Sequence, residues 1–233
     1  MITIFERQQF VSHYDPDEIR SYENIEFVKC KFYGGGFGYR HTPDYSRRTT
    51  AQNITIRNCE AKKFSIGPAL LRDIWIENLK SDMILAYGPL LEHVKFRGRC
   101  GKWLIHGTFQ GINQSELERA QYQPLCTRFY KTVDWAIDIS EAEFEDFDLR
   151  TGGIPAKLVK RDPETQVIIR RERAMQGSWR ELGLDRMTEI GLTLFLKEGA
   201  ADTVLVVPKR MKGAKRLVED LRKLQAAGIA EPD

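Results

Sequence analysis

The fold of this 233-residue chain is decided by a short motif that recurs along its first hundred residues. At residues 53–59 the motif reads Asn-Ile-Thr-Ile-Arg-Asn-Cys, and at residues 73–79 it reads Asp-Ile-Trp-Ile-Glu-Asn-Leu. Related stretches are Asn-Ile-Glu-Phe-Val-Lys-Cys at 24–30 and His-Val-Lys-Phe-Arg-Gly-Arg-Cys at 93–100. Each stretch begins with a polar residue, continues with Ile or Val, and has Ile or Phe two positions later. Such alternation is typical of a strand with one buried face.

The intervals between the motifs give the size of the repeating unit. Ile54, Ile74 and Val94 follow one another at equal intervals of twenty, whereas the interval from Ile25 to Ile54 is nine positions longer. The nine extra positions fall in the Gly-rich stretch 34–50, where an insertion costs little closure entropy. A unit of this length can form one coil of short strands, and each strand pairs with its copies above and below. The repeat therefore predicts a right-handed parallel β-helix with about 20 residues per coil.

The alternation returns at residues 136–149, after an interruption. The interval from Val94 to Ile137 equals two coils plus three further positions. The interruption contains a stretch that begins with capping residues at Asn113, and this stretch predicts a short inserted helix. The solenoid is expected to cover one range and to carry two insertions: residues 1–153, with insertions near 34–50 and 107–135.

These coils resemble those of right-handed β-helix proteins and, more loosely, those of pentapeptide-repeat solenoids. The second resemblance depends on Ala142-Glu143-Phe144-Glu145-Asp146, and the chain shows no sustained five-residue register. The resemblance covers roughly residues 20–150. It implies a fold and not an activity, because unrelated functions share such coils.

The last position of the motif is expected to form an internal column of the stack. Cys30, Cys59 and Leu79 would fill this column as small apolar side chains. The four cysteines of the chain show no CxxC spacing. The sequence therefore predicts buried, reduced thiols, with no metal site and no cofactor.

The first position of the motif is expected to form a polar column at a corner of the coil, where Asn and Asp accept local backbone hydrogen bonds. We interpret the histidine in this column as a corner residue rather than a functional one. The members of the column are Asn24, Asn53, Asp73 and His93.

The C-terminal third has a different period, and the change follows Gly152-Gly153-Ile154-Pro155. Residues 154–233 are expected to form an α-rich segment with one short strand, packed on the solenoid. The expected elements are a helical stretch at 162–182, helices at 187–197 and 212–227, and a strand at 203–207.

Aromatic and basic residues in and near the first insertion predict a surface for a protein partner, because such side chains are typical interface anchors. The alternative interpretation is a flexible excursion from the stack. Phosphate binding is not favoured, since the Gly-rich stretch lacks the GxGxxG and GxxxxGK[ST] spacings. The predicted partner-binding residues are Tyr33, Phe37, Tyr39, Arg40, His41, Tyr45, Arg47 and Arg48.

The sequence contains two clusters of like charge that are candidates for further sites. The acidic run at 141–148 is expected to be a solvated face rather than a calcium site. The basic patch lies where a helix N-terminus would favour acidic residues, so contact with nucleic acid is an alternative that is not favoured. The basic patch consists of Lys209, Arg210, Lys212, Lys215 and Arg216.

The composition excludes little by itself. The net charge of +3 requires neither a nucleic-acid nor a membrane partner. Because no apolar run is long enough to span a bilayer and no secretory signal opens the chain, a cytoplasmic location is expected. The oligomeric state cannot be read from the sequence.

No catalytic motif is present in the sequence. The leading hypothesis is therefore a non-enzymatic, macromolecule-binding β-solenoid, such as a toxin-neutralising or scaffold protein. The alternative is a small carbohydrate-active β-helix enzyme that would use carboxylates on one face of a coil.

Overall fold

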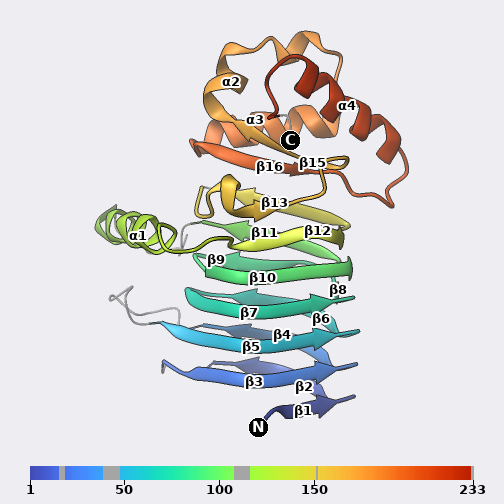
Figure 1. Cartoon of the computed structure of the whole chain (residues 1–233). Helices are drawn as coiled ribbons and strands as arrows, with labels where there is room; N and C mark the ends of the chain where they lie inside the picture. Colours follow the sequence, from blue (N-terminus) through green and yellow to red (C-terminus); the bar gives the residue numbers. More distant parts are fainter. Residues whose placement is uncertain (16–18, 39–47, 108–115, 151, 232–233) are drawn as a thin grey trace.

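The computed structural model describes the chain except for residues 16–18, 39–47, 108–115, 151 and 232–233. Two large parallel sheets face each other along most of the molecule, and helices cover one end of the stack (Figure 1). No helix of the described part is long and apolar enough to cross a membrane.

Sheet A and sheet B contain seven strands each within the described residues. In spatial order, sheet A consists of β1 (Thr3–Glu6), β3 (Ser21–Val28), β5 (Thr49–Arg57), β7 (Ala69–Glu77), β10 (Leu90–Arg99), β12 (Ile137–Glu143) and β14 (Val159–Lys160). Sheet B consists of β13 (Asp146–Arg150), β11 (Lys102–His106), β9 (Ile84–Tyr87), β6 (Glu60–Ile66), β4 (Lys31–Phe37) and β2 (Gln9–Tyr14), while β8 (Lys80–Ser81) pairs with β6.

The register of sheet A confirms the alignment of the motifs. Ile54 pairs with Ile74, and Ile74 pairs with Val94, so the regular interval of the sequence is one step of the stack. Ile25 pairs with Ile54 across the longer interval. Because the pairing is parallel and the chain passes to sheet B between these strands, each residue of a coil lies beside its equivalent in the next coil.

The nine extra positions of the first insertion are placed by the register. Phe37 still pairs with Ile66 across the longer interval, whereas Thr49 already pairs with Ala69 across the regular one. The surplus is therefore residues 39–47, which lie outside the described part of the chain.

The Gly-rich stretch before the insertion is not an excursion, which corrects the predicted start of the insertion. Residues 34–37 belong to β4, which pairs with both β2 and β6. A Cβ atom on Gly35 would lie 2.5 Å from the backbone oxygen of His13. Glycine is needed here because the neighbouring strand approaches too closely for a side chain.

The second insertion is also clearer in the structure. Val94 pairs directly with Ile137, so the interval between them holds one coil and a long surplus rather than two coils. The surplus lies between β11 and β12 and contains the predicted helix, α1 (Glu116–Phe129). The phenolic oxygen of Tyr130, just after α1, accepts a hydrogen bond from the backbone N–H of Leu91 at 3.1 Å.

The cysteines occupy the interior, as the motif predicts. Cys30, Cys59, Leu79 and Cys100 are at most 3 % exposed, and the cysteines are free thiols. The backbone N–H of Cys30 donates to Sγ of Cys59 at 3.3 Å, which shows that the two residues are stacked. Burial raises the pKa of Cys59 to about 11 and that of Cys100 to about 12, so both thiols remain protonated.

Left-handed backbone conformations recur at intervals of five residues within a coil, a feature that the alternation of apolar residues does not reveal. One coil has positive φ at Asn53, Asn58 and Lys63, and an earlier coil has it at Asn24, Lys29 and Gly34. The residues of the polar column thus have positive φ within the strands of sheet A, where Asn and Asp are tolerated better than most residues.

The C-terminal portion forms a second cluster of buried side chains, which includes Leu192 and Leu224. Its sheet pairs two antiparallel strands, and short 3₁₀ turns lie at Ala156–Leu158 and Trp179–Glu181. Its main elements are β15 (Gln166–Arg170), α2 (Arg171–Gln176), α3 (Arg186–Glu198), β16 (Asp202–Val206) and α4 (Ala214–Ala226).

The expected helices at 187–197 and 212–227 and the expected strand at 203–207 are confirmed within a few residues. The helical stretch expected from residue 162 is wrong in its first part, where Gln166–Arg170 forms β15. Its middle residues Val167, Ile168 and Ile169 are all buried, which suits a strand covered on both faces.

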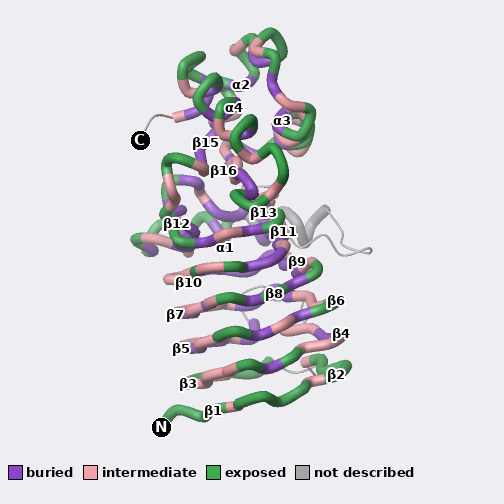
Figure 2. Tube along the Cα trace, turned by 90° about the vertical axis from the view of Figure 1, so that its right-hand side faces the viewer, coloured by how far each residue is buried: buried purple, intermediate pink, exposed green. Residues whose placement is uncertain are grey.

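Several polar contacts join this portion to the last coil. The side-chain amide of Gln166 donates to the backbone oxygen of Ile139 at 3.0 Å, and the hydroxyl of Thr203 donates to that of Leu149 at 3.1 Å. The side chains of Val159, Ile168 and Val204 belong to the hydrophobic core of the coils. Figure 2 shows the buried residues continuing from the stack into the helical end.

Candidate binding surface

The outward side chains of sheet A form an ordered surface, which we call the ladder face. In β7 the side chains of Ile74 and Ile76 are buried, so those of Trp75 and Glu77 point outward. Parallel pairing repeats this arrangement in each coil. The ladder face consists of Glu26, Arg57, Arg72, Trp75, Glu77, Glu92, Lys95, Arg97, Asp138 and Glu141.

Charges of opposite sign alternate from coil to coil on the ladder face. The guanidinium of Arg57 lies 2.7 Å from the carboxylate of Glu26 and 3.7 Å from that of Glu77. In the neighbouring coils, Arg72 lies 2.7 Å from Glu92. Opposite charges on adjacent strands contribute to sheet stability and hold their long side chains in fixed positions.

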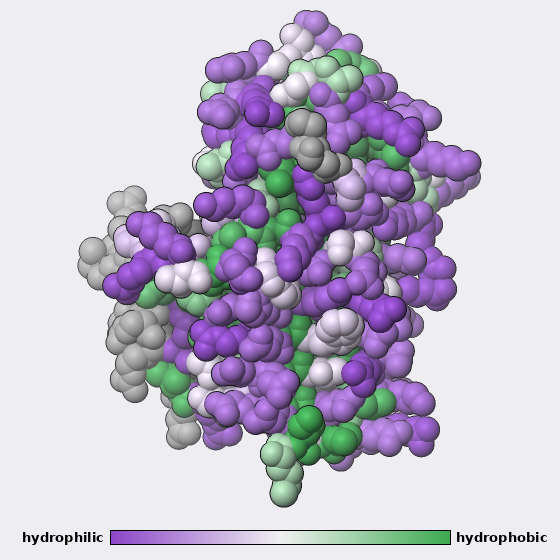
Figure 3. Space-filling view, viewed as in Figure 1, coloured by the Kyte–Doolittle hydropathy of each residue, from purple (hydrophilic) through white to green (hydrophobic). Residues whose placement is uncertain are grey.

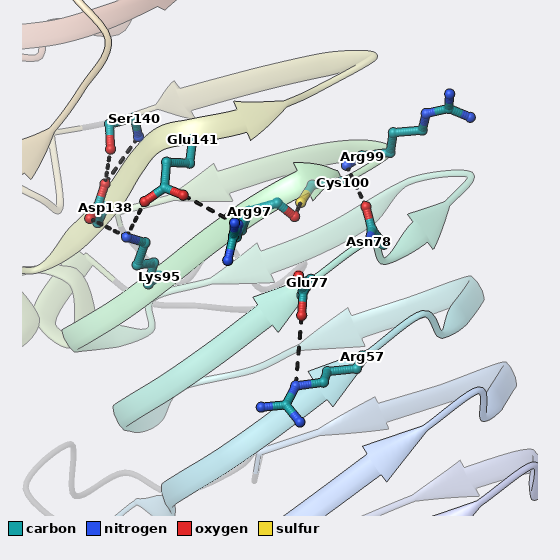
Figure 4. Close-up of polar contacts among 10 residues, drawn as sticks. All are labelled: Arg57, Glu77, Asn78, Lys95, Arg97, Arg99, Cys100, Asp138, Ser140 and Glu141. Atoms are coloured by element: carbon teal, nitrogen blue, oxygen red, sulfur yellow. Dashed lines mark hydrogen bonds and ion pairs between the residues drawn. The ribbon is translucent and has the colours of Figure 1, made fainter.

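The upper part of the ladder face is a network centred on one lysine (Figure 4). The ammonium of Lys95 contacts Glu141 and lies 3.5 Å from Asp138, while Arg97 lies 3.3 Å from Glu141. The hydrogen bond to Glu141 raises the pKa of Lys95. Lys95 also lies 5.3 Å from the centre of the Trp75 ring, a distance at which a cation attracts an aromatic face.

Side chains of the polar column bond to one another between coils. The amide of Asn53 donates to the side-chain oxygen of Asn24 at 2.6 Å. The column was expected to accept local backbone hydrogen bonds. Its contacts instead join neighbouring coils, because equivalent residues lie directly above one another.

The column ends in a cluster that sequence reasoning missed. The ring nitrogens of His93 lie 3.1 Å from Asp73 and 2.7 Å from Asp134. The hydrogen bond to Asp134 raises the pKa of His93, which favours the imidazolium form. The centre of the His93 ring lies 4.7 Å from that of Trp135, and the ammonium of Lys160 lies 4.1 Å from the Trp135 ring centre.

No local pattern could have revealed this cluster. Asp134 and Trp135 lie at the end of the second insertion, and His93 lies far before them in the sequence. Only the direct pairing of β10 with β12 brings them together. His93 therefore lies inside β10 and not at a corner of the coil, and it contacts two carboxylates and an aromatic ring beside the ladder face.

Three of the predicted partner-binding residues lie in the described part of the chain. Tyr33 faces outward from sheet B, where its hydroxyl donates to Glu60 at 3.2 Å and its ring faces the ammonium of Lys62. Phe37 packs against Tyr22 at the edge of the core, with ring centres 5.4 Å apart. The other predicted residues of the insertion lie outside the described residues: Tyr39, Arg40, His41, Tyr45 and Arg47.

Arg48 is buried rather than part of an exposed surface. Its exposed fraction is 7 %, and its guanidinium lies against the Tyr122 ring and donates to the backbone oxygen of Gly88. The structure therefore does not place Arg48 beside Tyr33 and Phe37 on one face.

The basic patch is divided by ion pairs. Lys209 lies 2.8 Å from Asp162, Arg210 lies 3.3 Å from Glu143, and Arg216 lies 3.3 Å from Asp185. Lys212 and Lys215 are exposed near the start of α4. Because neighbouring carboxylates neutralise three of the five cations, the patch is a weaker anion-binding surface than the sequence predicts.

A groove lies between β13 and α3, with a cavity of about 150 Å³. Asp146, Asp148 and Arg150 line one side, and Leu194 is among the apolar residues opposite. Partial burial and the nearby charge of Asp148 raise the pKa of Asp146, whereas Asp148 pairs with Arg150 at 2.6 Å. Within the residues described, no three His, Cys, Asp or Glu side chains are grouped in a way that could hold a metal ion.

Comparison with known protein families, with curated proteins and with solved structures gives no match.

Proposed function

We propose that the two parallel sheets are the sides of one right-handed β-solenoid, as the repeat predicts. The chain alternates between sheets A and B, and each return to sheet A brings equivalent residues into register. Crossover connections between parallel strands of one sheet are almost always right-handed. The solenoid supplies a rigid scaffold whose surface side chains repeat at the spacing of the strands, about 4.8 Å.

We propose that this solenoid is a non-enzymatic protein that binds another macromolecule, with the ladder face as the contact surface. The main support for this proposal is the ordered array of paired charges on the strands of sheet A, which lies beside the rings of Trp75 and Trp135. Aromatic rings and arginines are the residues that contribute most to protein interfaces. Fixed charges of alternating sign favour one complementary protein partner over others. Toxin-neutralising and scaffold proteins are two kinds of protein that would use such a surface.

Capture experiments with two double variants test this proposal. The ladder-face variant carries Arg57→Glu and Arg97→Glu, because both side chains are about half exposed and lie far from the core. The matched control carries Lys62→Glu and Lys80→Glu, which reverse two exposed charges on sheet B. Each protein is immobilised and exposed to lysate of the source cells, and bound proteins are quantified by mass spectrometry.

We expect one protein to be enriched on the wild type and on the control but to be lost from the ladder-face variant. Equal binding to all three proteins would show that the ladder face is not the contact surface. If the wild type enriches no protein at all, the binding function itself is wrong.

The groove favours a second candidate, the carbohydrate-active enzyme. Asp146 and Asp148 lie side by side in it and differ in environment, and a carboxyl group with a raised pKa can act as a general acid near an ionised neighbour. Release of reducing ends from a panel of soluble polysaccharides tests this candidate. Turnover by the wild type that Asp146→Asn abolishes would support it, and no turnover of any polysaccharide would dismiss it.

A further inference from the structure

Exposed apolar side chains are concentrated at the N-terminal end of the stack. Ile4 is 61 % exposed and Val11 is 59 % exposed, because they occupy outward positions of β1 and β2, in register with Glu26 and Tyr33. Figure 3 shows apolar atoms gathered at this end of the molecule. In the described part of the chain, the exposed large apolar side chains of this end are Met1, Ile2, Ile4, Val11, Tyr14 and Ile19.

Both sheets end here in strands with one unpaired side. β1 pairs with β3 and ends sheet A, while β2 pairs with β4 and ends sheet B. At the opposite end the C-terminal portion covers the last coil (Figures 1 and 2). The backbone N–H and C=O groups on the open side of β1 and β2 have the chemistry to pair with further strands.

The hydrophobic core between the two sheets is also uncovered at the N-terminal end of the stack. The ring of Phe5 is stacked on that of Phe27 at 5.3 Å, and the ring of Phe10 is stacked on that of Phe32 at 5.2 Å. Phe5 and Phe10 are only half-buried, because no coil covers their outer faces among the described residues. The outer face of each ring is therefore an aromatic surface of the same kind as the Phe27 and Phe32 ring faces, which Phe5 and Phe10 cover in the next coil.

Charge does not oppose contact between two copies of this end. Glu6 and Arg7 are the only acidic and basic side chains between Thr3 and Tyr14, apart from His13, and they form an ion pair at 3.7 Å. Within these two strands the charges of Glu6 and Arg7 therefore cancel, so the same strands of a second copy would meet little like-charge repulsion.

We propose that two copies of this chain associate end to end through their N-terminal coils. Phe5 and Phe10 of each copy pack against those of the other, and the edges formed by β1 and β2 pair in antiparallel fashion about a two-fold axis. A second copy fits because it offers the same open edges, the same half-covered rings and edge strands whose Glu6 and Arg7 charges cancel. Because the other end of each stack is covered, association closes as a dimer and does not continue as a fibre.

Molar mass in solution tests this proposal with the full chain. We expect sedimentation equilibrium of the wild type to give twice the mass of one chain, which is 27.0 kDa. Ile4→Lys and Val11→Lys place charge at outward positions of the edge strands, so each variant should fold. Paired edges of two copies would bring these like charges close together, so each variant should sediment as a single chain. Met187→Lys is the matched control, because it places the same charge on an exposed apolar side chain of α3 and should leave the dimer intact.

Hydrogen exchange identifies the surface directly. In the wild-type dimer the amides of β1 and β2 should exchange at least ~10-fold more slowly than in Ile4→Lys, while those of β7 should not change. A wild type that sediments as one chain at ~100 μM overturns the proposal, since an interface of ordinary size binds more tightly than this. A dimer that Met187→Lys dissociates, or that survives both edge variants, also overturns it.

Discussion

At the scale of single residues, the recurring left-handed positions shape each coil. Asn24, Asn53 and Asp73 have φ near +55° inside long strands, where most side chains would be strained. These bends let a strand change direction while it remains paired with the coils on either side. The hydrogen bond from Asn53 to Asn24 offsets part of the strain, because it is made only when the coils are stacked.

Gly98 provides a test of how tightly such a position is packed. A Cβ atom here would lie 2.3 Å from the side-chain oxygen of Asn78, at a φ of +65°. We expect Gly98→Ala to lower the free energy of unfolding by about 2–4 kcal/mol, from backbone strain and the clash together. Gly183→Ala is the control, because Gly183 has φ +59° with open space around it and should cost only about 1 kcal/mol. Urea denaturation measures both, and equal losses would contradict the packing argument.

His93 should make stability depend on pH. Its pKa is raised in the folded state by Asp134, so the folded protein binds the proton more tightly than the unfolded chain. The stabilisation is therefore complete below the unfolded pKa of about 6.5 and is lost as the pH rises through the higher folded value. His93→Asn removes the titrating group but keeps a residue that tolerates positive φ, as Asn53 does in the same column.

Melting temperatures at about pH 5.5 and pH 8.5 measure this effect, because the carboxylates remain ionised at both values. The wild type should exceed His93→Asn by more at the lower pH. A difference that is the same at both values, or larger at the higher pH, would show that the imidazolium does not stabilise the fold.

At the scale of elements, the strands that carry the motif were predictable to the residue, since Ile54, Ile74 and Val94 pair as their spacing indicates. The sequence did not indicate β4, because glycine has little tendency to form strands. Gly35 is required there by the close approach of β2. β15 was missed because Ile168 lies at helical spacing from Met175 and Trp179, while its true partner β16 follows only after α2 and α3. Local periodicity contains no information about such a partner.

The second insertion is anchored at the end of α1 by one buried hydroxyl. Tyr130 accepts a hydrogen bond from the backbone of Leu91 in β10 and is almost fully buried. Tyr130→Phe leaves the N–H of Leu91 without this acceptor, so we expect a loss of about 1–3 kcal/mol in the free energy of unfolding. Tyr33→Phe is the control, because its hydroxyl bonds to Glu60 near the surface and its loss should cost less than about 0.5 kcal/mol. Guanidinium denaturation compares them, and similar losses would argue against the anchor.

At the scale of the whole molecule, the ladder face could not be predicted from the sequence. Tyr33 and Phe37 could be selected from composition near the insertion, but neither belongs to the ladder face. Lys95 and Glu141 are far apart in the sequence, and their contact depends on where the second insertion is placed in the stack. The residues that share such a surface are set by the register between coils. This register can be read from the sequence only when the position and length of each insertion are known.

The predicted division at residues 153 and 154 has a measurable consequence. Gln166 and Thr203 bond to the last coil, and Ile168 and Val204 pack into its core. We therefore expect the parallel sheets and the C-terminal portion to unfold together, in one calorimetric transition. Ile139→Ala in the coils and Leu224→Ala in the C-terminal portion should each lower that one melting temperature, with losses of about 2–5 kcal/mol. Two transitions, each shifted by one variant alone, would show that the two parts are independent.

The direct pairing of β10 with β12 across the second insertion means that the height of the stack and the length of the chain are independent quantities. The stack grows by one strand spacing for each coil, whatever lies between two coils. A foreign segment introduced between β11 and β12 would alter the lateral surface of the molecule and leave the order of the strands in both sheets unchanged. The scaffold could therefore acquire or exchange lateral appendages while the faces that it presents stay in register.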